Sequence, residues 1–467
     1  MERETVMTRI WMISALVLTG AGCGGDTGGS GTGPATVTAT TGVTNPVTSR
    51  GDADTEEVLD VGNGSATAGA GDDNGNCGPD DVVTPNAVLE GTVYAPNMEI
   101  PISGALVYVA DDPAEPVPDE VYCAECVDLP CTANFVLTEP DGSFQLPAVA
   151  GAGKHLVVQK GQFLRDVVLD VAEGNNQVPP QQSNLPGEWN PAAGMWIPRI
   201  AVYETDPDQV FNVLAKFGLG EVSAGGTLIA GTERFTLISD SDQGAFMDDL
   251  VQMSQYHIIF VPCASTKYWV GAPFVPDARA QNIRDYVEAG GKWYATDHSN
   301  EYIEVPFPQY QEFHKPGMPD IQPAYDVTGT VQDPDLLAWL EALPPALKDI
   351  GGGNPNLFSL PSVELRLNYS GIDAVYDVIV QDDEGNDVNV GPYTYVSGPC
   401  TSCSDQFTFR PMAFAGGFGC GRMMYSTFEN SSVAHQGVNP QEQVLLYMIL
   451  EIGVCHDKPP PPIPPVG

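Results

Sequence analysis

Positive charge is scarce in this sequence. Its 467 residues include 19 Lys and Arg against 61 Asp and Glu, which gives a formal net charge of −42 at pH 7. A surface with so few cations cannot neutralise a phosphate backbone, so nucleic acid is excluded as a partner. Electrostatic docking on anionic lipid is disfavoured for the same reason.

The apolar run at residues 10–18 is too short to span a bilayer as a mature helix. Arg3 and Arg9 provide positive charge, and small residues lead to Cys23. This arrangement resembles the lipobox of bacterial lipoproteins, which implies that residues 1–23 are a signal peptide and that Cys23 is acylated. The alternative is an ordinary secretory signal. Both place the mature protein outside the cytoplasm. Gly24 resembles the residue found in outer-membrane lipoproteins, so we expect a lipid-anchored protein of the outer membrane or cell surface.

Large apolar side chains are nearly absent from residues 24–86, where Gly, Thr, Ser, Ala, Asn and Asp dominate. Such a segment cannot bury enough surface to offset the entropy lost on ordering. We therefore expect a disordered linker that holds the folded part away from the membrane. A short proline-rich tail, residues 457–467, is expected at the other end.

Nine of the ten cysteines remain if Cys23 carries lipid, and an exported compartment favours disulfides. Eight of them form a front and a back group: Cys77, Cys123, Cys126 and Cys131, then Cys400, Cys403, Cys420 and Cys455. Cys263 stands apart as the leftover thiol. We expect Cys400 or Cys403 to bond to Cys420 or Cys455. No His lies near the Cys-x-x-Cys pairs at zinc-finger spacing.

Residues 87–175 alternate apolar and polar positions between turn signals, which predicts short strands. The strands are expected at 89–94, 105–109, 135–138, 143–146, 155–159 and 167–171. The pattern at residues 91–93, 101–107 and 138–146 resembles the carboxypeptidase regulatory-like domain, a small β-sandwich. The resemblance implies an accessory module without catalytic residues. Tyr108 and Tyr122 are the aromatic candidates for a sugar platform, although we prefer the alternative that both rings pack inside.

After a connector at 176–195, residues 196–456 alternate strands with helices, which predicts a parallel sheet covered on both faces. Strands are expected at 199–203, 235–239, 257–261, 292–296, 374–381, 407–415 and 422–428. Helices are expected at 206–217 with Asp206 as the cap, 243–253, 277–289 and 440–453. The predicted fold class is therefore multidomain: an all-β sandwich followed by an α/β flavodoxin-like parallel sheet, preceded by a disordered linker.

The segments 256–263, 283–292, 295–298 and 421–428 resemble the class I glutamine amidotransferase-like group, in particular its trehalose-utilisation-type relatives, with an insertion around 300–370. Ligands of such sheets lie outside the carboxyl ends of the strands. That rule groups Cys263, Asp297, His298 and Glu429 at one candidate crevice. The nucleophilic cysteine of the relatives is replaced by Asp297 or His298, and no His adjoins Glu429. The resemblance therefore does not imply glutamine hydrolysis.

The function expected from these features is non-catalytic: an envelope-anchored binding or structural lipoprotein that recognises a glycan or a protein ligand. The alternative is a hydrolase of the amidotransferase-like fold that uses Cys263 or Asp297/His298. Asp297, His298 and Glu429 also offer nitrogen and oxygen ligands for a metal. Such groupings are common by chance, so no metal and no cofactor is predicted.

Overall fold

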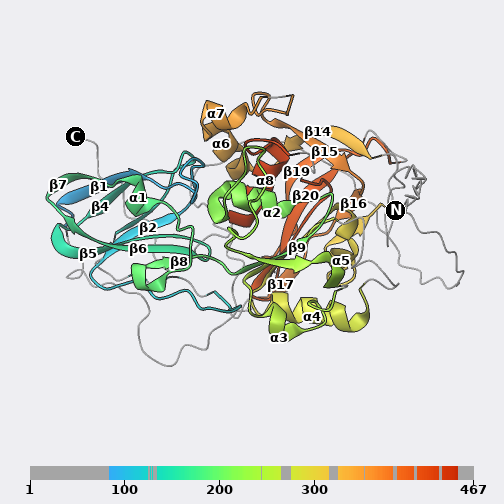
Figure 1. Ribbon diagram of the computed structural model, residues 1–467, viewed down its shortest axis with the longest axis horizontal. Coiled ribbons are helices and arrows are strands. Elements are labelled where there is room, and N and C mark those ends of the chain that lie inside the picture. The colour runs from blue at the N-terminus through green and yellow to red at the C-terminus, as the bar shows by residue number, and fades with distance from the viewer. Residues whose placement is uncertain are drawn as a thin grey trace, which may run out of the picture. The chain divides into compact units, whose positions relative to one another are not determined.

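The computed structural model describes residues 84–450, with gaps at 125–126, 128, 130–133, 243, 264–274, 315–323, 352, 382–386, 404–407 and 431–433 (Figure 1). The expected signal peptide with Cys23, nearly all of the linker, the tail, and Cys77, Cys126, Cys131 and Cys455 lie outside the described residues. Within the described part of the chain, no helix is long and apolar enough to cross a membrane.

Two facing β-sheets form the first folded part (Figure 1). One has the order β4-β1-β7, with β4 (Ser143–Ala148), β1 (Ala87–Thr92) and β7 (Gly174–Gln177). The other has the order β3-β2-β5-β6-β8, with β3 (Phe135–Leu137), β2 (Leu106–Ala110), β5 (Gly151–Lys160), β6 (Phe163–Val171) and β8 (Met195–Trp196). Leu89 and Leu146 from the first sheet share a core with Val107 and Val158 from the second. Each strand predicted from residue alternation overlaps an observed strand.

The outer face of the five-stranded sheet is also covered. Tyr108, Leu164 and Trp196 pack there with Val117 and Leu129. Tyr108 is only 5% exposed, which confirms the packed interpretation and excludes it as a sugar platform. The Tyr122 ring stands edge-on to His257, with ring centroids 5.7 Å apart.

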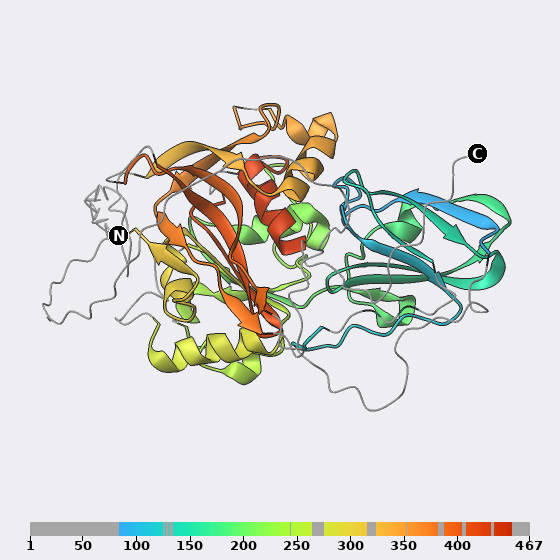
Figure 2. The ribbon, with the colours of Figure 1, turned by 180° about the vertical axis from the view of Figure 1, so that it is seen from behind.

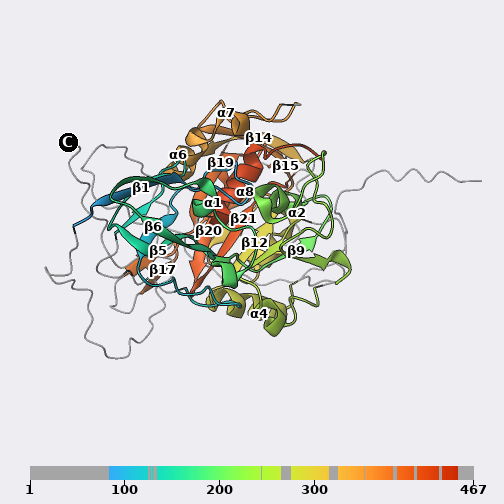
Figure 3. The ribbon, with the colours of Figure 1, turned by 60° about the vertical axis from the view of Figure 1, so that its left-hand side comes forward.

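A nine-stranded sheet organises the second part, in the order β10-β9-β11-β12-β21-β20-β19-β14-β15 (Figure 3). The first five strands are mutually parallel: β10 (Thr236–Ser239), β9 (Ile200–Glu204), β11 (Ile258–Val261), β12 (Lys292–Thr296) and β21 (Gly421–Ser426). The others pair antiparallel: β20 (Phe409–Phe418), β19 (Tyr393–Pro399), β14 (Tyr325–Val331) and β15 (Ser362–Asn368).

The expectation of an all-parallel sheet was therefore wrong for this half. β20 and β21 are joined by two residues, with Phe418 opposite Gly421, and so short a connection permits only antiparallel pairing. The insertion around 300–370 is an integral part of the domain, because it supplies β14 and β15 to the sheet.

Helices cover both faces of the parallel strands (Figure 2). Val202 and Phe260 pack with α2 (Val210–Leu214), η2 (Ala215–Leu219) and α8 (Pro440–Leu450). Their neighbours in sequence, Tyr203 and Val261, point the other way and pack with α3 (Leu250–Met253) and α4 (Asp277–Glu288). Successive residues of a strand face opposite sides, so both faces need apolar cover, and the sequence is apolar at both.

Two helices begin later in the sequence than predicted, and both starts lie close to proline or aspartate residues. The helix expected at 206–217 begins only after Gln209, which occupies the N-cap position, so Asp206 does not cap it. The helix expected at 243–253 is reduced to α3, whose cap Asp249 accepts hydrogen bonds from two backbone N–H groups. By contrast, α4 and β12 match their predicted ranges closely, and Gly290 (φ +112°) follows the end of α4.

The remaining elements are short: α1 (Pro180–Ser183), η1 (Pro191–Ala193), η3 (Asp240–Asp242), η4 (Asp297–Ser299), α5 (Glu301–Glu304), β13 (Gln311–Phe313), α6 (Pro334–Ala342), α7 (Pro345–Lys348), β16 (Ile372–Val375), β17 (Ile379–Gln381) and β18 (Asp387–Asn389).

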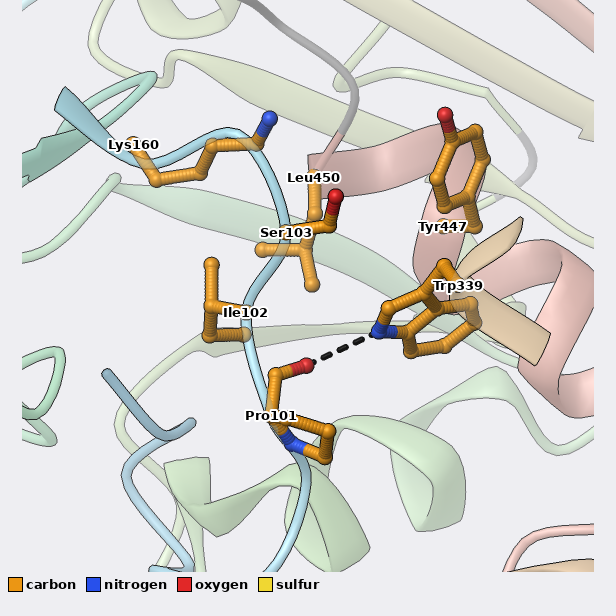
Figure 4. A pocket seen from close by; sticks show the side chains of 7 residues that line it. All are labelled: Pro101, Ile102, Ser103, Lys160, Trp339, Tyr447 and Leu450. Carbon is orange, nitrogen blue, oxygen red and sulfur yellow. Dashed lines mark hydrogen bonds between the residues drawn. The ribbon is translucent and has the colours of Figure 1, made fainter. Parts of the chain in front are cut away.

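The sandwich and the α/β part share one continuous apolar core. At their junction the Trp339 indole donates a hydrogen bond of 2.8 Å to the Pro101 carbonyl (Figure 4). Ile102 on the sandwich side and Tyr447 and Leu450 of α8 line the narrow gap beside this bond (Figure 4). These contacts make the junction a packed interior rather than a flexible linker.

Two disulfides lie in the described part of the chain, Cys123–Cys420 and Cys400–Cys403. The presence of disulfides is thus as expected, but the pairing is not. We expected Cys400 or Cys403 to bond to Cys420 or Cys455, whereas these two bond to each other and Cys420 reaches the sandwich. The expectation that disulfides form within the front group and within the back group is also wrong. The fold brings Cys123 of the front group to Cys420, which lies in the hairpin between β20 and β21.

Removing the Cys123–Cys420 bond should destabilise the protein more than removing Cys400–Cys403. The first closes a loop of 297 residues and the second a loop of 3. Chain entropy predicts losses on the order of 5 and about 2 kcal/mol respectively. The paired variants Cys123→Ser/Cys420→Ser and Cys400→Ser/Cys403→Ser can be compared by denaturant unfolding. Equal losses would contradict the loop-length argument.

Candidate functional site

Four acidic or thiol side chains come after four neighbouring parallel strands. Asp208 comes after β9, Cys263 after β11, Asp297 after β12 and Glu429 after β21. Carboxyl ends of parallel strands meet at one edge of the sheet, and that geometry brings side chains from distant parts of the sequence together. One ligand-type atom each from Cys263, Asp297 and Glu429 lie within 4.8 Å of one another.

Asp208 is fully buried and tied to its neighbours by several hydrogen bonds. Its Oδ1 accepts from the Asn430 backbone N–H at 2.9 Å and from the Asn430 amide at 3.0 Å, and its Oδ2 accepts from the Thr296 hydroxyl. Thr296 Oγ1 in turn accepts from the Cys263 backbone N–H at 2.8 Å. Burial raises the pKa of Asp208 to about 6, although the bonds from Thr296 and Asn430 act to lower it.

Asp297 occupies the turn directly after β12 in a left-handed conformation, φ +45°. This region is costly for residues other than glycine and is maintained only where the surroundings impose it. The Tyr369 backbone N–H donates to both carboxylate oxygens at 3.0 and 3.2 Å, and the Tyr425 hydroxyl donates to the Asp297 carbonyl at 2.5 Å. Asp297 therefore lies on a sharp turn that its neighbours hold in place.

Glu429 and Cys263 complete the group. They are 1% and 2% exposed, and a hydrogen bond joins their side chains. Burial, with the charge of Asp208 second, raises the pKa of Glu429 to about 8. Burial and then the charges of Glu429 and Asp297 raise the pKa of the Cys263 thiol well above its usual value. Burial followed by the Glu429 charge also raises the pKa of Asp297. At neutral pH Glu429 and the Cys263 thiol retain their protons, and the thiol is not an activated nucleophile.

His298, the fourth residue predicted for the crevice, is not one of the three convergent groups. It is 6% exposed, and its ring stands against Tyr369 with centroids 5.2 Å apart. His435 lies elsewhere as well: its Nε2 is 3.0 Å from Glu442 Oε2 and 2.9 Å from Lys216 Nζ. The structure therefore assembles Cys263, Asp297 and Glu429, and assigns both histidines to other contacts.

Sequence reasoning missed Asp208. The Asp206-Pro207-Asp208 segment resembles a helix start, which draws attention to Asp206 as a cap. The position of Asp208 could have identified it. Asp208 comes after the first parallel strand, β9, and the neighbouring strand β11 leads to Cys263. Thr296 and Asn430, which orient Asp208, could not be identified from residue type alone.

An open hollow lies apart from this buried group. It measures about 510 Å³ and is lined by Gly187, Glu188, Met195, Gly218, Gly220, Glu221, Gly231, Thr232 and Arg234. Gly218 has φ +108°, and a Cβ there would lie 2.4 Å from the Asn97 backbone nitrogen. Only glycine fits this approach of the two domains, and four glycines leave backbone groups accessible at the hollow.

The fold and the site together define a β-sandwich fused to an α/β domain with an acidic group at the strand ends. No family model matches the chain, and no curated protein matches it. Among solved structures, a ThuA-like protein from Bacteroides uniformis is similar, at 12% identity and a TM-score of 0.31, over 54% of this chain and 90% of that one.

A cytoplasmic protein from Salmonella typhimurium is similar at 12% identity and a TM-score of 0.29, over 55% of this chain and 98% of its own. A β-galactosidase from Bacillus circulans is similar at 11% identity and a TM-score of 0.26, over 53% of this chain but only 30% of the enzyme. At such TM-scores the similarity transfers no function to this chain.

The Cys263 thiol should resist alkylation in the folded protein. It is buried and keeps its proton at neutral pH, and the thiolate is the reactive form. Iodoacetamide at neutral pH, followed by peptide mass spectrometry, should label Cys263 in denatured protein and leave it unlabelled in native protein. Faster labelling of the native protein, slowed by His298→Ala, would instead identify an activated thiol.

Proposed function

We propose that this protein is an envelope lipoprotein that binds a glycan without chemically changing it. In this proposal Cys23 carries the lipid and residues 24–86 act as a tether. The disulfides Cys123–Cys420 and Cys400–Cys403 support export, because such bonds persist in oxidising compartments.

The finer fold assignments belong to the same proposal. The five parallel strands, numbered in chain order, lie in the order 2-1-3-4-5, the order of flavodoxin-like sheets. This supports the flavodoxin-like, amidotransferase-like interpretation of the α/β part. The strand positions between Ala87 and Val171 support a carboxypeptidase regulatory-like sandwich, which would serve as an accessory module.

The open hollow is the observation that carries the ligand-binding proposal. Its volume of about 510 Å³ falls in the range of small-molecule and oligosaccharide sites. Glu188, Glu221 and Arg234 are charged side chains that can pair with hydroxyl groups, and the glycines offer backbone donors and acceptors. A protein partner would favour an apolar, aromatic centre, whereas Met195 is the one large apolar residue in the lining. The hollow therefore suits a hydroxyl-rich ligand better than a protein surface.

The buried group supports a non-catalytic role. A catalytic thiol must be deprotonated beside a base and reachable by substrate. Cys263 is 2% exposed and protonated at neutral pH, and His298 packs against Tyr369. These features disfavour acyl transfer through the thiol.

Glycan binding should depend on the charged residues of the hollow. Glu221→Gln and Arg234→Ala should each weaken binding to an oligosaccharide panel by about tenfold, because a hydrogen bond to a charged group contributes about 1.5 kcal/mol. Glu99→Gln, an exposed glutamate outside the hollow, is the matched control. Saturation-transfer NMR and immobilised glycans provide the measurement. Binding that is unchanged in all three variants would locate the ligand elsewhere.

A hydrolase remains the second candidate, because one observation favours it. Asp297 sits on a strained turn beside Glu429, and a glutamic acid that is protonated at neutral pH can donate a proton to a leaving group. The test is turnover of chromogenic glycosides and amides. Activity that is lost in Asp297→Asn but retained in Glu99→Gln would displace the non-catalytic proposal.

A further inference from the structure

The group at the strand ends contains the kinds of atoms that proteins use to bind metals. One sulfur and two carboxylate oxygens, from Cys263, Asp297 and Glu429, lie within 4.8 Å of one another. They come from three adjacent parallel strands, so the sheet itself fixes their relative positions. A tetrahedral zinc ion keeps its ligand atoms roughly 3.5 Å apart, a spacing that small side-chain rotations can reach from here.

The charges in this group are all of one sign. Cys263, Asp297 and Glu429 each become an anion on losing a proton, and the Asp208 carboxylate is linked to the Cys263 backbone through Thr296. Buried anions without a counter-ion are costly, so such a group must either retain protons or hold a cation. A divalent cation would replace the protons of the thiol and carboxyl groups, which would be released to solvent on binding.

A second observation points to a ligand. Glu429 is 1% exposed, yet its Oε2 has no hydrogen-bond partner among the described residues. Buried carboxylate oxygens are normally satisfied, and an orphaned one calls for an explanation. Asp297, by contrast, receives the Tyr369 N–H, which holds its carboxylate in place. One carboxylate is thus oriented by the protein, and the other has an open coordination position.

The donor atoms select the class of metal. Calcium and magnesium prefer oxygen ligands alone, whereas a thiolate with carboxylates suits zinc and similar transition ions. Around the group, Asp208 and Thr296 form a chain of hydrogen bonds to the Cys263 backbone, the kind of outer support that orients metal ligands.

We propose that Cys263, Asp297 and Glu429 bind one divalent transition-metal ion of the zinc type. Three protein ligands leave a fourth position for water or a ligand group. The site is independent of the glycan proposal, because the hollow shares none of these residues.

The test uses full-length protein freed of metal by a chelator and titrated with Co²⁺ and then Zn²⁺. Wild type should bind one equivalent of Co²⁺ with a thiolate-to-metal absorption band in the near ultraviolet, which Zn²⁺ abolishes by displacement. Cys263→Ser should lose the band. Glu429→Gln and Asp297→Asn should each weaken binding by at least about tenfold, since changes even in outer-shell partners cost 10–100-fold. Glu301→Gln, a partly buried carboxyl outside the group, should bind like wild type.

Thermal melting of each variant checks that it folds, and the mildest change, Glu429→Gln, decides the matter if Cys263→Ser does not fold. A wild type without the band, or a band that persists in folded Cys263→Ser, overturns the proposal. So does unchanged affinity in Glu429→Gln. If Glu221→Gln and Arg234→Ala lose glycan binding but still bind the metal like wild type, the metal site and the glycan site are separate.

Discussion

The structure depends on one constraint: parallel strands in the centre of a sheet must be covered on both faces. Residues alternate sides along β9 and β11, so Val202 and Phe260 face one apolar layer and Tyr203 and Val261 the other. The α2 and α8 helices cover the first face of the sheet, and α3 and α4 cover the second face. The sandwich extends the first layer, and this makes the two folded parts a single apolar interior.

The same sheet explains why acidic side chains lie close together in a site that is buried from solvent. Four neighbouring parallel strands lead into Asp208, Cys263, Asp297 and Glu429, and each of these four residues is at most 2% exposed. Hydrogen bonds stabilise two of these directly, through Asn430 and Tyr369. The others depend on a proton or, in our proposal, a metal. The ordinary cost of burying charge is thus concentrated at one edge of the fold.

Much of the local structure could be predicted from the sequence, because it depends on short-range patterns. Period-2 alternation located the sandwich strands, and the amphipathic pattern at 277–289 with the Gly290 turn after it located α4 and the start of β12. The rule that ligands lie beyond the carboxyl ends of parallel strands grouped Cys263, Asp297 and Glu429. These are three of the four buried residues found at the strand ends, and Asp208 is the fourth. The failures were long-range: the antiparallel pairing of β20 and β21, the strands supplied by the insertion, and the partners of Cys420. Asp208 was missed because Asp206 was interpreted as the cap of a helix that in fact begins only after Gln209.

The bond between Cys123 and Cys420 has a consequence for how the chain responds to proteolysis. It joins an early residue to one 297 positions later, so it encloses most of the α/β domain in a covalent ring. A protease that cuts the backbone once anywhere inside that ring produces two chains that remain attached to each other. If the N-terminal end is anchored, as we propose, the cut half is not shed from the cell. Damage by a single cleavage would then be invisible to any assay that looks for released fragments and would appear only after reduction.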